Sequence, residues 1–504
     1  MIKLIYRIES DYMSKKRMLI VTSVTLSVVT ISLGIVKLYQ TYALSNYIGT
    51  VTDTGIDVYI NDDSYASIPA NGSSNVYYML TNTNPGTVKY GVAYQTTSGV
   101  TVKVYDTSED PATGTIEEND KKYIKLHLEN KNSTNKTIEL STVLGYENGG
   151  DLVVPSGVTL VTDTYTPPPT AAEYITKLYT TASKTTVTNN SITYNTAPSV
   201  SLMNDRLGGT TTDLDGGNIR YYGANPNNYI YFNCSDYSNQ TSSTCETWRI
   251  IGVFDGKLKL IRGSQIGTYS WDNKNTNTGA EDKWGKNDWT TARLMKLLNP
   301  SDYYTVDSND NNLGQSLYYN STSGKCYSGQ NNATKDCDFT STGIKDTTRN
   351  MIAETTYYLG GWNNVSVYPN QIYEYERGTT VYTGRPTTPW TGKIALAYPS
   401  DYGYAADLNQ CKDKTLYDYN NSTCTSNNWM KAIITNNGSN SGWLLTPYCS
   451  TSSNVWYVYP VGNVYFNYTV YSAFGAVPVL SLSSELGIES GGDGSSSNPY
   501  KLSA

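Results

Sequence analysis

The stretch CETWRIIGVFDGKLKLIR, residues 245–262, carries the strongest local fold signal in this sequence. Apolar residues alternate through Thr247–Phe254 and again through Lys257–Arg262, with Asp255-Gly256 between the two runs. An Asp-Gly pair flanked by alternating apolar residues is typical of a β-hairpin with a two-residue turn. The stretch therefore predicts an antiparallel hairpin within a sheet-containing domain.

Helix and strand patterns alternate on the C-terminal side of this hairpin. Trp289–Asn299 is amphipathic and follows Asp288, a predicted N-cap, and Ile344–Leu359 predicts a second helix ended by Gly360-Gly361. Strands are expected at Tyr229–Asn233, Lys393–Tyr398, Trp429–Ile434 and Gly442–Thr446. Two helices among many short strands predict an α+β domain over residues 217–504.

A different, all-β pattern occupies residues 45–163. Short alternating runs recur between turn signals at Gly55–Ile60, Val76–Leu80, Val88–Tyr94, Val100–Tyr105, Tyr123–Leu128, Thr137–Leu144 and Val158–Val161. About seven strands over this length fit an immunoglobulin-like β-sandwich. The acidic stretch Ser108–Asp120 is interpreted as a long loop, and His127 is expected to point off a sheet face.

Residues 164–216 predict a connection between these two domains. Three prolines, Pro167 to Pro169, favour an extended spacer. Thr170 then caps a helix that begins at Ala171, and Thr- and Asn-rich sequence of low complexity follows.

Residues 1–44 predict a membrane anchor. Met18–Val36 is an uncharged run of 19 residues, preceded by Lys15, Lys16 and Arg17. That length spans a hydrocarbon core of about 30 Å, and the basic flank places the N-terminus in the cytoplasm. A signal peptide cleaved near Ala43 is the alternative, and both interpretations place the remaining chain outside the membrane.

The cysteines agree with an exported protein. All 7 lie after residue 230, and six form three pairs with short polar intervals: Cys234 and Cys245, Cys326 and Cys337, Cys411 and Cys424. Local disulfides within each pair are the simplest interpretation, although six cysteines allow other connectivities. Cys449 is left over.

Charge and histidine content exclude several functions. The net charge of -7 and the absence of a basic patch outside the N-terminus argue against a nucleic-acid partner. No histidine follows His127, which excludes a Ser-His-Asp or Cys-His arrangement and a histidine-bound metal there. No cofactor is expected. A structural calcium ion is the alternative, but it is unsupported, because Asp213–Gly217 and Asp307–Asn312 lack the full pattern of a calcium loop.

The C-terminal stretch Trp443–Leu480, WLLTPYCSTSSNVWYVYPVGNVYFNYTVYSAFGAVPVL, resembles a binding surface. Tyr and Trp provide contact area at low entropy cost, and Ser and Asn provide adaptable hydrogen bonds. We expect valines 455, 458, 464 and 470 to pack inward and the polar and aromatic residues to face a ligand. The predicted ligand-binding residues are Tyr448, Ser450, Ser453, Asn454, Trp456, Tyr457, Tyr459, Asn463, Tyr465, Asn467, Tyr468 and Tyr471.

Five phrases together resemble an uncharacterised C-terminal domain of exported proteins from Gram-positive gut bacteria. They are residues 245–262, WTTARLMKLLN (289–299), TGKIALAYPSDYGYA (391–405), GWLLTP (442–447) and the end of the chain, 474–502. That family is similar to the C-type-lectin-like, formylglycine-generating-enzyme-like fold of the variable proteins of diversity-generating retroelements. The resemblance implies ligand contacts in one hypervariable C-terminal stretch, although Val477 stands where the variable proteins have arginine.

These observations predict a single-pass protein of the bacterial cell membrane with most of its chain outside the cell. Its function would be adhesion to an extracellular protein or glycan, without catalysis. One alternative is a secreted hydrolase of glycans or cell wall with a carboxylate pair drawn from Glu354, Glu374, Glu376 and Asp401. Another is a structural component of a surface layer, which predicts self-association.

Overall fold

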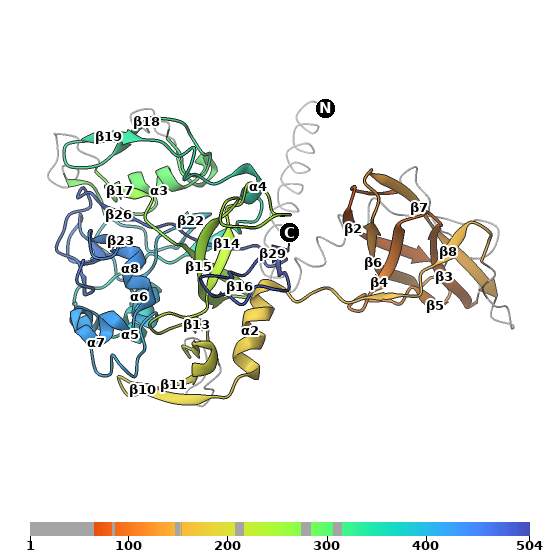
Figure 1. Ribbon diagram of the computed structural model, residues 1–504, viewed down its shortest axis with the longest axis horizontal. Helices are drawn as coiled ribbons and strands as arrows, with labels where there is room; N and C mark the ends of the chain where they lie inside the picture. The colour runs from red at the N-terminus through yellow and green to blue at the C-terminus, as the bar shows by residue number, and fades with distance from the viewer. Residues whose placement is uncertain are drawn as a thin grey trace, which may run out of the picture. The chain divides into compact units, whose positions relative to one another are not determined.

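Two compact units, divided after Pro167, make up the computed structural model (Figure 1). The structure describes residues 65–82, 86–146, 152, 154–206, 216–273, 284–305 and 315–503. The predicted anchor Met18–Val36, the predicted strand Gly55–Ile60 and the acidic segment Asp307–Asn312 lie outside these residues. None of the described helices is both long and apolar enough to cross a bilayer.

The first unit is a sandwich of two sheets. Its strands are β1 (Tyr65–Ile68), β2 (Gly72–Thr81), β3 (Val88–Gln95), β4 (Val100–Tyr105), β5 (Thr113–Ile116), β6 (Lys121–Asn130), β7 (Lys136–Tyr146), β8 (Val158–Leu160) and β9 (Thr164–Tyr165). One sheet has the order β1-β7-β3-β5 with β8 beside β3, and the other has the order β2-β6-β4-β9. Alternate residues of both sheets, such as Tyr78 and Leu80 from β2 and Ile138 and Leu140 from β7, fill one shared core.

Pairing partners distant in sequence account for the differences from the predicted sandwich. The predicted loop Ser108–Asp120 contains strand β5, which pairs with β3. Strand β9 lies in the segment predicted as a spacer, but it pairs with β4 in parallel. His127 points off the outer face of its sheet, as predicted, because Leu126 and Leu128 on either side of it face the core. It is nevertheless buried, since the Tyr165 ring of β9 stacks on it with ring centroids 3.6 Å apart.

The second unit combines short helices with many strands, as predicted. Its helices are α2 (Ala171–Thr181), η1 (Pro198–Val200), α3 (Arg293–Leu298), η3 (Ser301–Tyr303), α4 (Asp346–Arg349), α5 (Pro369–Glu376), α6 (Pro399–Tyr404), η4 (Leu416–Asn420), α7 (Ser422–Ser426) and α8 (Trp429–Ile434). Its strands are β10 (Thr185–Asn189), β11 (Ile192–Ala197), β12 (Leu202–Asn204), β13 (Ile219–Tyr221), β14 (Tyr229–Phe232), β15 (Glu246–Phe254), β16 (Lys257–Arg262), β17 (Gly267–Tyr269), β18 (Gly324–Tyr327), β19 (Thr334–Cys337), β20 (Thr355–Tyr357), β21 (Trp390–Gly392), β22 (Ile394–Ala395), β23 (Gly442–Pro447), β24 (Val455–Val458), β25 (Val464–Tyr465), β26 (Phe474–Ala476), β27 (Val479–Ser481), β28 (Gly487–Ile488) and β29 (Leu502–Ser503).

The predicted hairpin of β15 and β16 lies within the largest sheet of this unit. Asp255 and Gly256 form its turn with φ values of 49° and 70°, the left-handed conformation that an Asp-Gly turn provides. The strand order is β10-β11-β12-β13-β15-β16-β27-β22, and β14 pairs with β15. The hairpin thus lies between β13, from the first part of the second unit, and β27, from its last part.

The segment predicted to connect the two domains contributes structure to the second unit. Thr170 caps α2 through a capping box with Glu173, as expected. However, α2 contributes Ile175 and Tyr179 to the main core, and β10, β11 and β12 extend the large sheet. The chain divides into its two units within the proline segment, after Pro167, so α2 and the strands β10 to β12 belong to the second unit.

Two predicted helices are shorter than expected, and one predicted strand is a helix. Helix α3 is shorter than Trp289–Asn299 and begins after Ala292, while Asp288 accepts hydrogen bonds from Thr290 in the preceding turn. The predicted helix over residues 344–359 is one helical turn, α4, followed by strand β20, which pairs with β21. The predicted strand Trp429–Ile434 is the helix α8.

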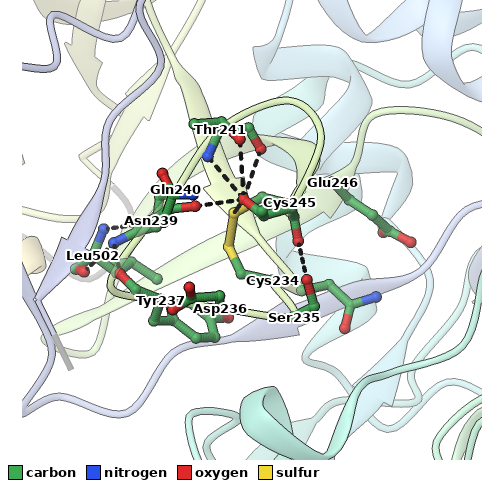
Figure 2. The surroundings of a disulfide bond; sticks show 12 residues. Cys234, Ser235, Asp236, Tyr237, Asn239, Gln240, Thr241, Cys245, Glu246 and Leu502 are labelled. Atoms are coloured by element: carbon green, nitrogen blue, oxygen red, sulfur yellow. Dashed lines mark hydrogen bonds between the residues drawn. A yellow bond between two sulfur atoms is a disulfide. The ribbon is translucent and has the colours of Figure 1, made fainter.

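The three predicted disulfides are confirmed. Cys234 bonds to Cys245, Cys326 to Cys337 and Cys411 to Cys424, and Cys449 is free. Figure 2 shows the first disulfide, whose loop contains the buried Gln240. The Gln240 side chain donates to the Leu502 carbonyl oxygen at 2.7 Å and accepts from the Leu502 N–H at 2.9 Å. This loop therefore also fixes strand β29 at the end of the chain.

Candidate ligand-binding surface

The tyrosine-rich stretch forms part of a five-stranded sheet with the order β17-β26-β23-β24-β25. Strands β24 and β25 form a hairpin in which Tyr457 lies opposite Tyr465 and Val458 lies opposite Val464. The Tyr459 N–H donates to the Asn463 carbonyl oxygen at 2.9 Å and closes the turn. The valines at 455, 458, 464 and 470 are fully buried, as predicted.

The prediction that Trp456, Tyr457 and Asn463 point outward was wrong. The side chains of Trp456 and Tyr457 have an exposed fraction of 0%, and Asn463 is buried as well. Strand β24 is covered on both faces, because Trp456 packs into one hydrophobic cluster and Tyr457 into another. A strand buried on both faces does not alternate between apolar and polar residues.

Tyr457 is the centre of an aromatic cluster beneath the surface. Its ring centroid lies 5.1 Å from that of Phe474, 5.3 Å from that of Tyr459 and 5.5 Å from that of Tyr468. Its hydroxyl hydrogen-bonds to the Asn467 side-chain oxygen. Burial, reinforced by Tyr459, raises the pKa of Tyr457 far above its usual value, so this phenol stays neutral. Tyr457 therefore supports the surface and is not itself accessible to a ligand.

The remaining predicted residues reach the surface to different extents. Ser450, Asn467 and Tyr468 are exposed, and the exposed fraction of Tyr468 is 42%. Six are half-buried: Tyr448, Ser453, Asn454, Tyr459, Tyr465 and Tyr471. We call these nine residues the tyrosine surface.

Stacked rings hold several of these side chains in place. Phe466 stacks on Tyr448 with ring centroids 3.9 Å apart and on Tyr465 at 5.2 Å. Tyr417, from η4, lies 5.5 Å from Tyr465 and has an exposed fraction of 44%, so it extends the surface. Tyr417 was not among the predicted residues, because it lies in the loop of the Cys411–Cys424 disulfide, outside the tyrosine-rich stretch.

Two residues from other parts of the chain fix the loop between β23 and β24. The Asn287 side-chain amide donates to the carbonyl oxygens of Tyr448, Thr451 and Asn454 at 2.8, 2.8 and 2.9 Å. Arg385 donates to the Asn287 side-chain oxygen at 3.1 Å and to a loop carbonyl oxygen at 2.7 Å. Nothing in the local sequence pattern indicates these roles. The loop is thus held rigidly by bonds to its backbone.

The chemistry of this surface suits binding by contact and hydrogen bonding. Residues 448–472 contain no Asp, Glu, Lys, Arg or His. The free thiol of Cys449 is half-buried, and burial raises its pKa, which disfavours the reactive thiolate. Rigid rings beside amide and hydroxyl groups contact a ligand with little loss of side-chain entropy.

The four carboxylates considered for a hydrolase lie in different environments. Glu354 and Glu374 are exposed, whereas Glu376 and Asp401 are buried. Ser400, the neighbour of Asp401 in the chain, donates to Glu376 through both its N–H and its hydroxyl, at 2.9 and 2.5 Å. Burial raises the pKa of Glu376 to about 7, against the opposing effects of Arg377 and Ser400.

Asp401 belongs to an enclosed network of charges. It accepts hydrogen bonds from Lys259 and, at 3.0 Å, from Arg220, which also pairs with the buried Asp205. Burial raises the pKa of Asp401, but Lys259 and Arg220 outweigh it, so the pKa falls below its usual value. Asp401 is therefore part of a buried network of ion pairs in the core. The side chain of Glu376 is buried as well.

No protein-family model, curated protein or solved structure matches this chain.

Proposed function

We propose that this chain is a single-pass protein of the bacterial cell surface that binds an extracellular protein or glycan through the tyrosine surface. The three disulfides support an oxidising, extracellular environment for the second unit. The hydrophobic run at 18–36 supports attachment to the membrane. The first unit would then be a spacer, and the second unit would carry the ligand site.

The observation that carries this proposal is the rigid presentation of uncharged aromatic and amide groups. Tyr468 and Asn467 are exposed above the buried Tyr457, and Asn287 fixes the adjoining loop. Preorganised groups of this kind lose little entropy when they bind a partner, as in antibody paratopes. A purely structural sheet would not need exposed rings at this position.

We further propose finer fold assignments. The two-sheet core of the first unit is compatible with an immunoglobulin-like sandwich. The second unit would be a C-type-lectin-like domain, and residues 448–472 would be its variable segment. A near-repeat of the codons for 448–472, differing at adenines and adjacent to a reverse transcriptase gene, would support hypervariation.

Binding measurements with surface variants test the proposed function. The purified chain is first screened against glycan arrays and intact cells, and bound targets are then tested with Tyr468→Ala and Asn467→Ala. Tyr319→Ala is the matched control, because Tyr319 has an exposed fraction of 51% and lies outside the tyrosine surface. We expect binding to fall more than about tenfold in the surface variants and to remain in the control.

Two outcomes would contradict the proposal. Unchanged binding in both surface variants would show that the ligand contacts another part of the chain. Self-association of the purified chain with no bound target would favour a structural component of a surface layer.

A further inference from the structure

A cleft of about 530 Å³ opens in the second unit, and none of its lining residues belongs to the tyrosine surface. It is lined by β14, β15, the end of β16 and the end of helix α8. Its volume lies within the range of about 300–1,000 Å³ that is typical of small-molecule sites. Its lining residues are Tyr229, Glu246, Thr247, Arg249, Arg262, Gly263, Ser264, Ala432, Ile433, Asn436 and Asn437.

Arg249 is a buried cation in the wall of this cleft. Its exposed fraction is 6%, and its guanidinium lies 3.6 Å from the ring centroid of Tyr229 and 4.9 Å from that of Trp429. It donates to the Asn228 side-chain oxygen at 2.5 Å and to the Pro226 carbonyl oxygen at 3.2 Å. Both acceptors are neutral, and no carboxylate in the described part of the chain pairs with Arg249.

The second arginine of the cleft is already neutralised. Arg262 donates to both oxygens of Glu246, at 2.9 and 3.1 Å, in a bidentate pair. The two arginines and one glutamate leave the cleft with one net positive charge, located at Arg249. Burial of this charge is unfavourable and lowers the pKa of Arg249 to about 10. A single anionic group would compensate it.

The rim of the cleft consists of small polar side chains. Thr247, Ser264, Asn436 and Asn437 are all exposed and present hydroxyl and amide groups. Asn436 and Asn437 have φ values of 47° and 54°, so they also form the turn that ends α8. Hydroxyl and amide groups around one cation are complementary to a ligand with one negative charge and several hydroxyl groups.

A structural role explains only part of this arrangement. The stacking of Arg249 between Tyr229 and Trp429 connects β14 and β15 to helix α8. A neutral side chain would make the same apolar contacts without the cost of a buried, uncompensated charge.

We propose that this cleft binds an acidic sugar, with the ligand carboxylate paired to Arg249 and the ligand hydroxyls bonded to the polar rim. The cleft shares no residue with the tyrosine surface, so this site does not depend on the proposed function. The sugar class follows from the combination of one uncompensated cation with hydroxyl and amide partners.

Ligand-observed NMR and calorimetry with paired sugars test this proposal. Galacturonate, glucuronate and N-acetylneuraminate are the acidic probes, and galactose and glucose are neutral controls that lack the carboxylate. We expect at least one acidic sugar to bind more than about tenfold tighter than the neutral sugars, because a charge-assisted pair contributes at least this factor.

Two variants locate the binding within the chain. Arg249→Gln removes the cation, and Ala432→Trp fills the cleft from the exposed position of Ala432 while leaving the arginine intact. Both should abolish binding of the acidic sugar. Arg349→Gln is the matched control, because Arg349 also lies against tyrosine rings but has a carboxylate partner, Asp346.

The results that would overturn the proposal are specific. Binding of the acidic sugar that persists in Ala432→Trp would place the site elsewhere. Equal affinity for sodium acetate, or tighter binding of a short polyglutamate peptide, would refute the sugar assignment. No binding of any of the three acidic sugars would refute the site. Because Ala432 is exposed, this test remains decisive even if Arg249→Gln fails to fold.

Discussion

Replacing Tyr457 by alanine should destabilise the second unit severely, whereas the same change at Tyr468 should not. Tyr457 is fully buried among Trp443, Phe474 and two other tyrosines. Removal of a buried aromatic ring typically costs about 3–5 kcal/mol. A domain is usually stable by only about 5–15 kcal/mol, so little stability would remain. Tyr468 has an exposed fraction of 42%, and we expect its alanine variant to lose about 1 kcal/mol or less.

The variant Tyr457→Phe separates the contribution of the ring to stability from that of its hydroxyl. It retains the packing against Phe474 and removes the hydroxyl that bonds to Asn467. Because Asn467 is exposed, water can replace that bond, and we expect a loss of about 1 kcal/mol. The expected order of stability is wild type, then Tyr468→Ala or Tyr457→Phe, then Tyr457→Ala.

Urea unfolding followed by tryptophan fluorescence measures these differences in the intact chain. All 9 tryptophans lie at or after Trp248, so the signal reports the second unit without interference from the first. Equal slopes of free energy against urea would show that the variants differ in native stability. A Tyr457→Ala variant within about 1 kcal/mol of wild type would refute the burial on which this reasoning depends.

Three further predictions concern the core and its cross-links. The double variant Cys411→Ser, Cys424→Ser should lose about 2–4 kcal/mol, because it opens a loop with a sequence separation of 13, and the urea midpoint would reveal this. Glu376 has a folded pKa of about 7, above its unfolded value, so its protonation stabilises the fold below about pH 4.5. That stability, roughly 3 kcal/mol, is lost as the pH rises to about 7, and Glu376→Gln should flatten the dependence of the unfolding free energy on pH over this range. Arg220→Met should lower the free energy of unfolding by about 3–5 kcal/mol, because the buried carboxylates of Asp205 and Asp401 both lose the positive charge of Arg220. An unchanged thermal midpoint would contradict this prediction.

Features specified by neighbouring residues were predictable from the sequence. The hairpin at Asp255-Gly256, the capping box at Thr170 and the three disulfides all depend on short intervals. By contrast, the six-residue run Trp429–Ile434 is too short for periodicity to distinguish helix from strand. The Asn428 side chain, which accepts from the Met430 N–H, was the local signal for a helix.

The candidate site was predictable only in part, because its exposure depends on distant segments. The buried valines of the tyrosine-rich stretch matched the expectation. Trp456 and Tyr457 did not, because clusters on both faces of β24 include residues far away in the sequence. The support of the loop by Asn287 and the addition of Tyr417 are also contacts over more than 30 residues along the chain. No local pattern encodes such contacts.

The beginning and the end of the second unit are joined to each other. Thr170 forms an antiparallel bridge with Gly487, and the Ala171 N–H donates to the Leu486 carbonyl oxygen at 2.7 Å. Leu502 is in turn held by Gln240. Mechanical tension that enters through the proline segment is therefore resisted first by these terminal strands and the adjoining disulfide loop.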